Sequence, residues 1–166
     1  MLLKALHIQH IKKGIFISFF LISALISAQE EKEALQKLSF MIGNWQGTST
    51  SFSNNTQKSV SVSENVRYIL NGNLITLDVK SPWIELHTII SFNKKEQSYY
   101  YHPFSKTGVK AGYKGTYKDG VFRVYFNPGR RLTFTQTTKG EFHEYGEQLK
   151  NGVWEKYFED ILQSSK

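Results

Sequence analysis

Residues 58–70 read KSVSVSENVRYIL, and this stretch decides the fold that we expect. Apolar side chains recur at every second position, with serine, asparagine and arginine between them. A period of two is typical of a β-strand with one buried face and one face in water. The buried face would hold Val60, Val62, Glu64, Val66, Tyr68 and Leu70. Glu64 is the only carboxylate on that face, which makes it the most informative residue of the strand.

The same pattern continues beyond this strand and is interrupted by turn signals such as Asn71-Gly72, Asp119-Gly120 and Asn151-Gly152. The expected strands cover residues 44–53, 58–70, 73–80, 83–92, 97–103, 109–118, 121–127, 131–138, 141–149 and 153–160. Short connections join antiparallel neighbours, and closing the sheet on itself removes exposed edges. We therefore expect an all-β fold, an antiparallel up-and-down β-barrel of about ten strands. A barrel of that size is wide enough to leave an internal cavity.

One short helix should precede the barrel. Residues 30–41 read EEKEALQKLSFM and place Ala34, Leu35, Leu38 and Met41 at helical spacing, with acidic residues in the first turn. From Trp45 onward the period changes to two, which marks the start of the first strand.

Residues 1–28 have the features of a secretory signal peptide. Three lysines precede the apolar run 15–22, and the small residues Ser27 and Ala28 end the segment. The whole apolar stretch is about 13 residues, shorter than the roughly 20 that a membrane-spanning helix needs. We expect a signal peptide at 1–28, a single barrel domain at 29–166, and a bacterial protein exported to the periplasm or secreted.

Charge and cysteine content exclude several function classes. Without the three lysines of the expected signal peptide, 18 Lys and Arg face 14 Asp and Glu, so the net charge is about +4 rather than +7. These basic residues are spread over many strands, and we expect no nucleic-acid partner. The chain has no cysteine, which excludes disulfides, thiolate catalysis and zinc–thiolate sites.

The inward faces supply the candidate ligand contacts. A carboxylate on an apolar face must be paired, hydrogen-bonded or protonated, so Glu64 either binds the polar head of a ligand or pairs with Arg123 or with inward tyrosines. Residues 99–104, YYYHPF, offer a stacking surface for a ligand or serve only packing. The predicted ligand-binding residues are Glu64, Tyr101, Tyr113, Tyr117, Phe134 and Gln136.

We assign no catalytic residue, metal ligand or cofactor. His87, His102 and His143 lack the spacing of a local metal site, although strands of a barrel could bring them together. No nucleophile elbow or phosphate loop occurs. Glu141 and Glu144 fall on opposite faces of a strand, so they cannot flank one bond together.

Residues 40–47, FMIGNWQG, form a helix end that runs into Gly-x-Trp-x-Gly, and they resemble the opening of the calycin-like barrels, which include lipocalins and fatty-acid-binding proteins. With LNGNL at 70–74 and NGVW at 151–154, the chain is similar to a bacterial family of exported lipocalin-like barrels whose function is not established. This resemblance implies that Trp45 plugs the closed end of the barrel against the helix.

Nitrobindin-like haem barrels share this opening and hold haem iron through a histidine near the C-terminus. Residues 152–158, GVWEKYF, contain no histidine, and none follows His143, so the sequence departs from that group and we expect no haem.

Three kinds of function remain. The first is an exported binding module whose cavity holds a small, largely apolar molecule without catalysis. The second is a structural or protein-interaction domain of the cell envelope, with a working surface around Asn54, Asn55 or residues 105–108. The third is an enzyme that uses an inward Glu or His as general base on a lipophilic substrate.

Overall fold

The computed structural model describes residues 29–53, 56–109 and 111–165. The expected signal peptide, residues 1–28, lies outside the described residues, as do Asn54 and Asn55 of one proposed interaction surface.

The one short helix that the sequence predicts is present at residues 29–36, followed by a 3₁₀ turn, η1 (Ser39–Met41). The α-helix ends earlier than expected because Leu38 and Met41 donate their backbone N–H groups three residues back, which tightens the chain into 3₁₀ geometry. Leu35, Leu38 and Met41 are fully buried, as their spacing predicts. Among the described residues, no helix is long and apolar enough to cross a bilayer.

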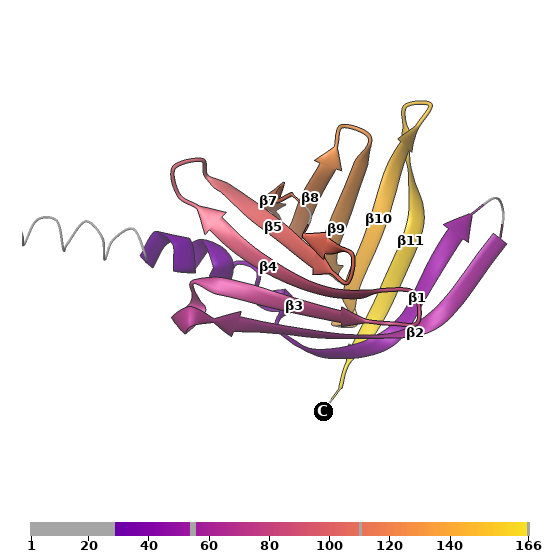
Figure 1. Cartoon of the computed structure of the whole chain (residues 1–166), viewed down its shortest axis with the longest axis horizontal. Helices are drawn as coiled ribbons and strands as arrows, with labels where there is room; N and C mark the ends of the chain where they lie inside the picture. Colours follow the sequence, from indigo (N-terminus) through magenta and orange to yellow (C-terminus); the bar gives the residue numbers. More distant parts are fainter. Residues whose placement is uncertain (1–28, 54–55, 110, 166) are drawn as a thin grey trace, which may run out of the picture.

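Ten strands form the wall of a closed antiparallel barrel, which confirms the predicted fold (Figure 1). They are β1 (Gly43–Ser53), β2 (Thr56–Ile69), β3 (Leu74–Lys80), β4 (Glu85–Asn93), β5 (Ser98–Ser105), β7 (Tyr113–Lys118), β8 (Val121–Asn127), β9 (Arg130–Gln136), β10 (Phe142–Lys150) and β11 (Val153–Ser164). A two-residue strand, β6 (Gly108–Val109), pairs with the end of β5. The predicted strand 109–118 is thus divided, and its continuous part begins at Tyr113.

Each wall strand pairs with the next one in the chain, and β1 pairs with β11 to close the barrel. Gly47 lies at this closure, opposite Leu162. A β-carbon on Gly47 would lie 2.1 Å from the carbonyl oxygen of Ile161, so the two strands can approach this closely only because residue 47 has no side chain.

One end of the barrel, which we call the helix end, is closed by residues 29–41. Figure 1 shows the helix beside the connections β2–β3 and β4–β5. The Tyr99 hydroxyl donates to the Ala34 carbonyl at 2.7 Å, and the Trp45 indole N–H donates to the Met41 carbonyl at 2.8 Å. Trp45 therefore lies buried against the closing segment, at the place that the resemblance implies.

Aromatic rings fill the half of the barrel nearest the helix. Neighbouring ring centroids lie 4.9 to 6.1 Å apart along the series Phe92, Tyr99, Phe122, Phe134, Phe142 and Trp45. These side chains come from β4, β5, β8, β9, β10 and β1, so they join the wall across the interior. The core is thus concentrated at the helix end.

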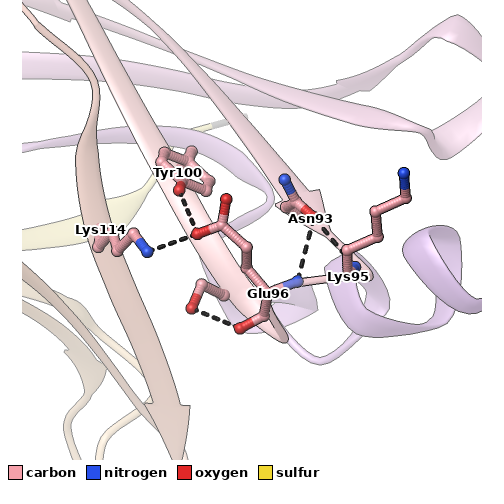
Figure 2. Close-up of polar contacts among 6 residues, drawn as sticks. Asn93, Lys95, Glu96, Tyr100 and Lys114 are labelled. Atoms are coloured by element: carbon pink, nitrogen blue, oxygen red, sulfur yellow. Dashed lines mark hydrogen bonds and ion pairs between the residues drawn. The ribbon is translucent and has the colours of Figure 1, made fainter.

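A polar cluster on the outer surface fixes the β4–β5 turn beside the helix (Figure 2). The Asn93 side-chain oxygen accepts from the backbone N–H groups of Lys95, at 3.0 Å, and Glu96, at 3.2 Å. The Glu96 carboxylate accepts from the Tyr100 hydroxyl at 2.7 Å and from the Lys114 ammonium group. This cluster ties β5 to β7 and has a structural role.

The alternation in residues 58–70 predicts the buried face of β2 correctly except at its end. Val62, Glu64 and Val66 are buried, whereas Leu70 is 68% exposed. Leu70 lies outside the strand, in a short 3₁₀ turn, η2 (Leu70–Gly72), and its own φ is positive, at 47°. The period of two no longer applies there.

Candidate functional site

A cavity of about 590 Å³ occupies the end of the barrel opposite the helix, which we call the open end. Its wall is mostly apolar and includes the aromatic rings of Tyr101 from β5, Tyr113 from β7, Phe126 from β8, and Tyr157 and Phe158 from β11. Serine, asparagine and arginine side chains also line it. Trp83 and Ile84, in the β3–β4 connection, lie at its mouth and are about half exposed. The cavity is present because the bulky core residues are gathered at the helix end.

Two acidic side chains, Glu144 on β10 and Asp160 on β11, also line this cavity. Together with Glu64 on β2 they form what we call the carboxyl cluster. One carboxyl oxygen from each lies within 4.8 Å of the others. The exposed fractions are only 3% for Glu64, 7% for Glu144 and 5% for Asp160.

Barrel closure brings the carboxyl cluster together. In the strand register, Asp160 lies opposite Glu144 of β10 on one side and opposite Ser49 of β1 on the other. Glu64 lies opposite Trp45 in the register of β2 and β1, closer to the helix end. Glu144 and Asp160 are thus neighbours within the β10–β11 hairpin, and Glu64 joins them only when β1 pairs with β11.

The carboxyl cluster lacks the partners that buried acids usually have. In the part of the chain that the structure describes, no hydrogen-bond partner reaches either oxygen of Glu64, Oε2 of Glu144 or Oδ1 of Asp160. The expected partner Arg123 alternates with the buried residues Phe122 and Val124, so it belongs to the outer face of β8. The alternative in which Glu64 pairs with Arg123 is therefore not realised in the structure.

Burial and mutual repulsion hold protons on the cluster. Burial, then the charge of Asp160, raises the pKa of Glu64 to about 8. Burial, followed by the charges of Glu64 and Asp160, raises the pKa of Glu144 well above its usual range. Burial also raises the pKa of Asp160 to about 6, against a lowering hydrogen bond with Ser49.

At neutral pH the carboxyl cluster therefore holds both protons and negative charge. Asp160 is largely ionised and Glu64 is largely protonated, while burial and the neighbouring charges favour the protonated form of Glu144. The three acids titrate as a coupled group. A protonated carboxyl donates one hydrogen bond and an ionised carboxylate only accepts. These oxygens can pair with an ammonium group, exchange a proton with a ligand or ligate a hard cation.

Three of the six predicted ligand-binding residues lie in or beside the cavity. Tyr101 and Tyr113 line it, and Glu64 lies behind Glu144 and Asp160 in the carboxyl cluster. Tyr113 packs edge-on against Phe126, with ring centroids 4.8 Å apart.

The other three lie elsewhere. Phe134 is fully buried in the core, 6.0 Å from the ring of Tyr101. Tyr117 packs near Phe40 at the helix end, with ring centroids 6.4 Å apart. Gln136 is exposed at the end of β9, where its side chain donates to the Gly140 carbonyl at 3.1 Å. Tyr117 and Gln136 were expected in the cavity because alternation indicates the face of a strand, but not the height along the barrel.

Sequence reasoning missed Glu144 and Asp160, although the signal that singled out Glu64 was present for both. Glu144 alternates with the buried residues Phe142 and Gly146 on β10. Asp160 alternates with Phe158 and Leu162 on β11, a strand that extends beyond the predicted end at residue 160.

The three described histidines do not converge. His87 pairs with Asp78, and the Nε2 atom of His143 lies 2.7 Å from a carboxylate oxygen of Glu159. His102 stacks on Tyr100, with ring centroids 5.9 Å apart. None of the three lines the cavity.

No protein-family model matches this chain, and no curated protein matches it in sequence. The class is therefore defined by fold and site. The chain forms a closed ten-stranded antiparallel β-barrel, consistent with a calycin-like fold, with a mostly apolar cavity at one end. Two of the three buried acids line this cavity, and the third lies next to them.

Proposed function

We propose that this protein binds a small, largely apolar molecule in the cavity at the open end of the barrel. The observation that carries the proposal is a cavity of about 590 Å³ in which aromatic and aliphatic side chains outnumber the polar ones. Ligand pockets typically measure about 300 to 1,000 Å³ and have this composition. The proposal includes no chemical step on the ligand.

We further propose that the protein acts outside the cytoplasm of a bacterium, as an exported lipocalin-like binding protein. The basic and apolar pattern of residues 1–28 supports export. Expression of the full chain in a bacterium should give a periplasmic or secreted form that begins near Gln29. Retention of residues 1–28 in a cytoplasmic product would contradict this part of the proposal.

The binding function is tested on the natively purified protein. Mass spectrometry under non-denaturing conditions should detect a small-molecule adduct, or the empty protein should take up an apolar fluorescent probe at one site. An absorbance scan for haem belongs to the same experiment, because a Soret band would favour a haem protein instead.

Two substitutions on β1 locate the bound probe. Ser51 lines the cavity, so Ser51→Phe should fill it and abolish probe uptake. Thr48 is exposed on the outer face of the same strand, so Thr48→Phe should leave uptake unchanged. An empty protein that takes up no probe, or equal uptake by both variants, would contradict a ligand site in the cavity.

A further inference from the structure

On the basis of the proposed binding function, we propose that the ligand carries a cationic group, such as a protonated amine, and that Glu144 and Asp160 hold this group at the base of the cavity. The ligand class is then a lipophilic amine rather than a neutral lipid or a fatty acid.

The position of Glu144 and Asp160 favours a cationic ligand. Both line the cavity, both are more than nine-tenths buried, and each has an oxygen without a hydrogen-bond partner. A buried carboxylate without a donor is costly, and an ammonium group supplies up to three donors together with the opposite charge. A carboxylate ligand would instead be repelled.

The aromatic rings of the cavity wall also favour a cationic ligand. The rings of Tyr101, Tyr113 and Tyr157 line the cavity and provide π-faces that attract cations, as well as apolar surface for the rest of the ligand. One of these rings already holds a cation at the rim, because the guanidinium of Arg130 lies 4.3 Å from the ring centroid of Tyr157. Arg130 is exposed and leaves the acids unpaired.

Binding of a cation should also release protons from the carboxyl cluster. Glu64 lies within the carboxyl cluster and does not line the cavity. A cation bound by Glu144 and Asp160 favours their ionised forms, so protons leave the cluster on binding. The other titratable groups that act on these acids are Tyr101, whose own pKa is raised by burial and by the charge of Glu144, and Glu159, whose charge acts on Asp160.

An amine fits the site better than a bare divalent cation. Calcium takes six to eight oxygen ligands, and Mg²⁺ needs an octahedral set. Here two of the three acids face the cavity, and most of the surrounding wall is aromatic or aliphatic. A single ammonium group on an apolar body matches both parts of the cavity.

The test compares three ligands with the same eight-carbon chain: octylamine, octanol and octanoate. Isothermal titration calorimetry on the ligand-free protein at pH 8 should give an affinity for octylamine about tenfold or more above that for octanol, with octanoate weakest. Titrations in buffers of different ionisation enthalpy should detect proton release with octylamine alone.

Variants attribute this preference to the two acids. The double variant Glu144→Gln/Asp160→Asn should bind octylamine and octanol equally. The control Glu155→Gln removes an exposed acid on β11 that pairs with Lys150, and it should keep the wild-type preference. If the double variant fails to fold, the wild-type pH profile still decides, because the ratio of octylamine to octanol affinity should rise between pH 5 and pH 8.

The outcomes separate this inference from the proposed function. Equal binding of octylamine and octanol, tighter binding of octanoate, or a flat pH profile would overturn the cationic ligand and leave the binding function in place. Stoichiometric binding of Ca²⁺ that the double variant abolishes would overturn it in favour of a metal site. Failure of all three ligands and of the fluorescent probe to bind would overturn both proposals.

Discussion

Replacing Glu64 with glutamine should stabilise the protein at alkaline pH and leave it unchanged in mild acid. The Glu64 side chain is 3% exposed, and neither of its oxygens has a hydrogen-bond partner. Glutamine has nearly the same shape and remains neutral at every pH. The substitution therefore removes the ionisation and keeps the packing.

The magnitude follows from the pKa of Glu64, which burial raises from its usual 4.5 to about 8. Because the folded protein holds this proton more tightly than the unfolded chain, the stabilisation is fully present below about pH 4.5 and is lost as the pH rises towards 8. A tenfold difference in acid constant is worth about 1.4 kcal/mol. Because Glu64 ionises in the unfolded chain at a much lower pH than in the folded protein, the free energy of unfolding falls by about 3 kcal/mol by pH 7 and by about 5 kcal/mol by pH 8.5.

Urea unfolding followed by tryptophan fluorescence measures this difference at pH 4.5, 7 and 8.5. The free energies of unfolding of wild type and Glu64→Gln should coincide at pH 4.5. At higher pH the free energy of unfolding of the variant should exceed that of wild type, by about 3 kcal/mol at pH 7 and by about 5 kcal/mol at pH 8.5. Glu96→Gln is the matched control. Lys114 and Tyr100 hold the pKa of Glu96 below its usual value. Glu96→Gln should therefore lower the free energy of unfolding at pH 7 rather than raise it.

Two results would refute the reasoning about Glu64. One is a wild-type stability that stays constant from pH 5 to pH 8. The other is a variant that is less stable than wild type by the same amount at every pH, which would indicate a Glu64 carboxylate that is paired or hydrated.

Three further substitutions test the fold. Trp45→Phe leaves the buried Met41 carbonyl without its indole donor, so urea unfolding should show a loss of about 1–3 kcal/mol; an unchanged free energy would contradict the hydrogen bond. Gly47→Ala places a β-carbon against the Ile161 carbonyl oxygen, so amide exchange should accelerate first in β1 and β11, and uniform acceleration would argue against a local effect. Leu35→Ala empties a fully buried site at the helix end and should cost about 2–5 kcal/mol while probe affinity stays the same, since the cavity is at the other end.

Alternation along the chain is sufficient to predict the barrel. Strand β8 has the predicted bounds, residues 121–127, and its buried residues Phe122 and Val124 follow the period of two. The prediction succeeds because each wall strand pairs with its neighbour in sequence, so local turns determine the order of the sheet. Local signals fail where the backbone leaves the strand, as at residues 111 and 112, just before β7.

The site was predicted only in part because it depends on two quantities that a period of two does not contain. One is the height of a residue along the barrel axis, which separates Tyr113 in the cavity from Tyr117 at the helix end. The other is the register of the strand pairs, which places Asp160 beside Glu144 in the β10–β11 hairpin and near Glu64 across the closure. Each acid has a local signal, but the proximity of Glu64 to the other two appears only in the closed barrel.

The pairing of β1 with β11 also has a consequence for the newly synthesised chain. Trp45, near the start of β1, pairs with Ser164 at the end of β11, so one edge of β1 stays open until the last strand has been made. Until then β1 and β10 present unpaired backbone groups, which promote aggregation, and such distant contacts slow folding. Substitutions that weaken β11 should therefore reduce the yield of correctly folded chains more than the stability of those that have already folded.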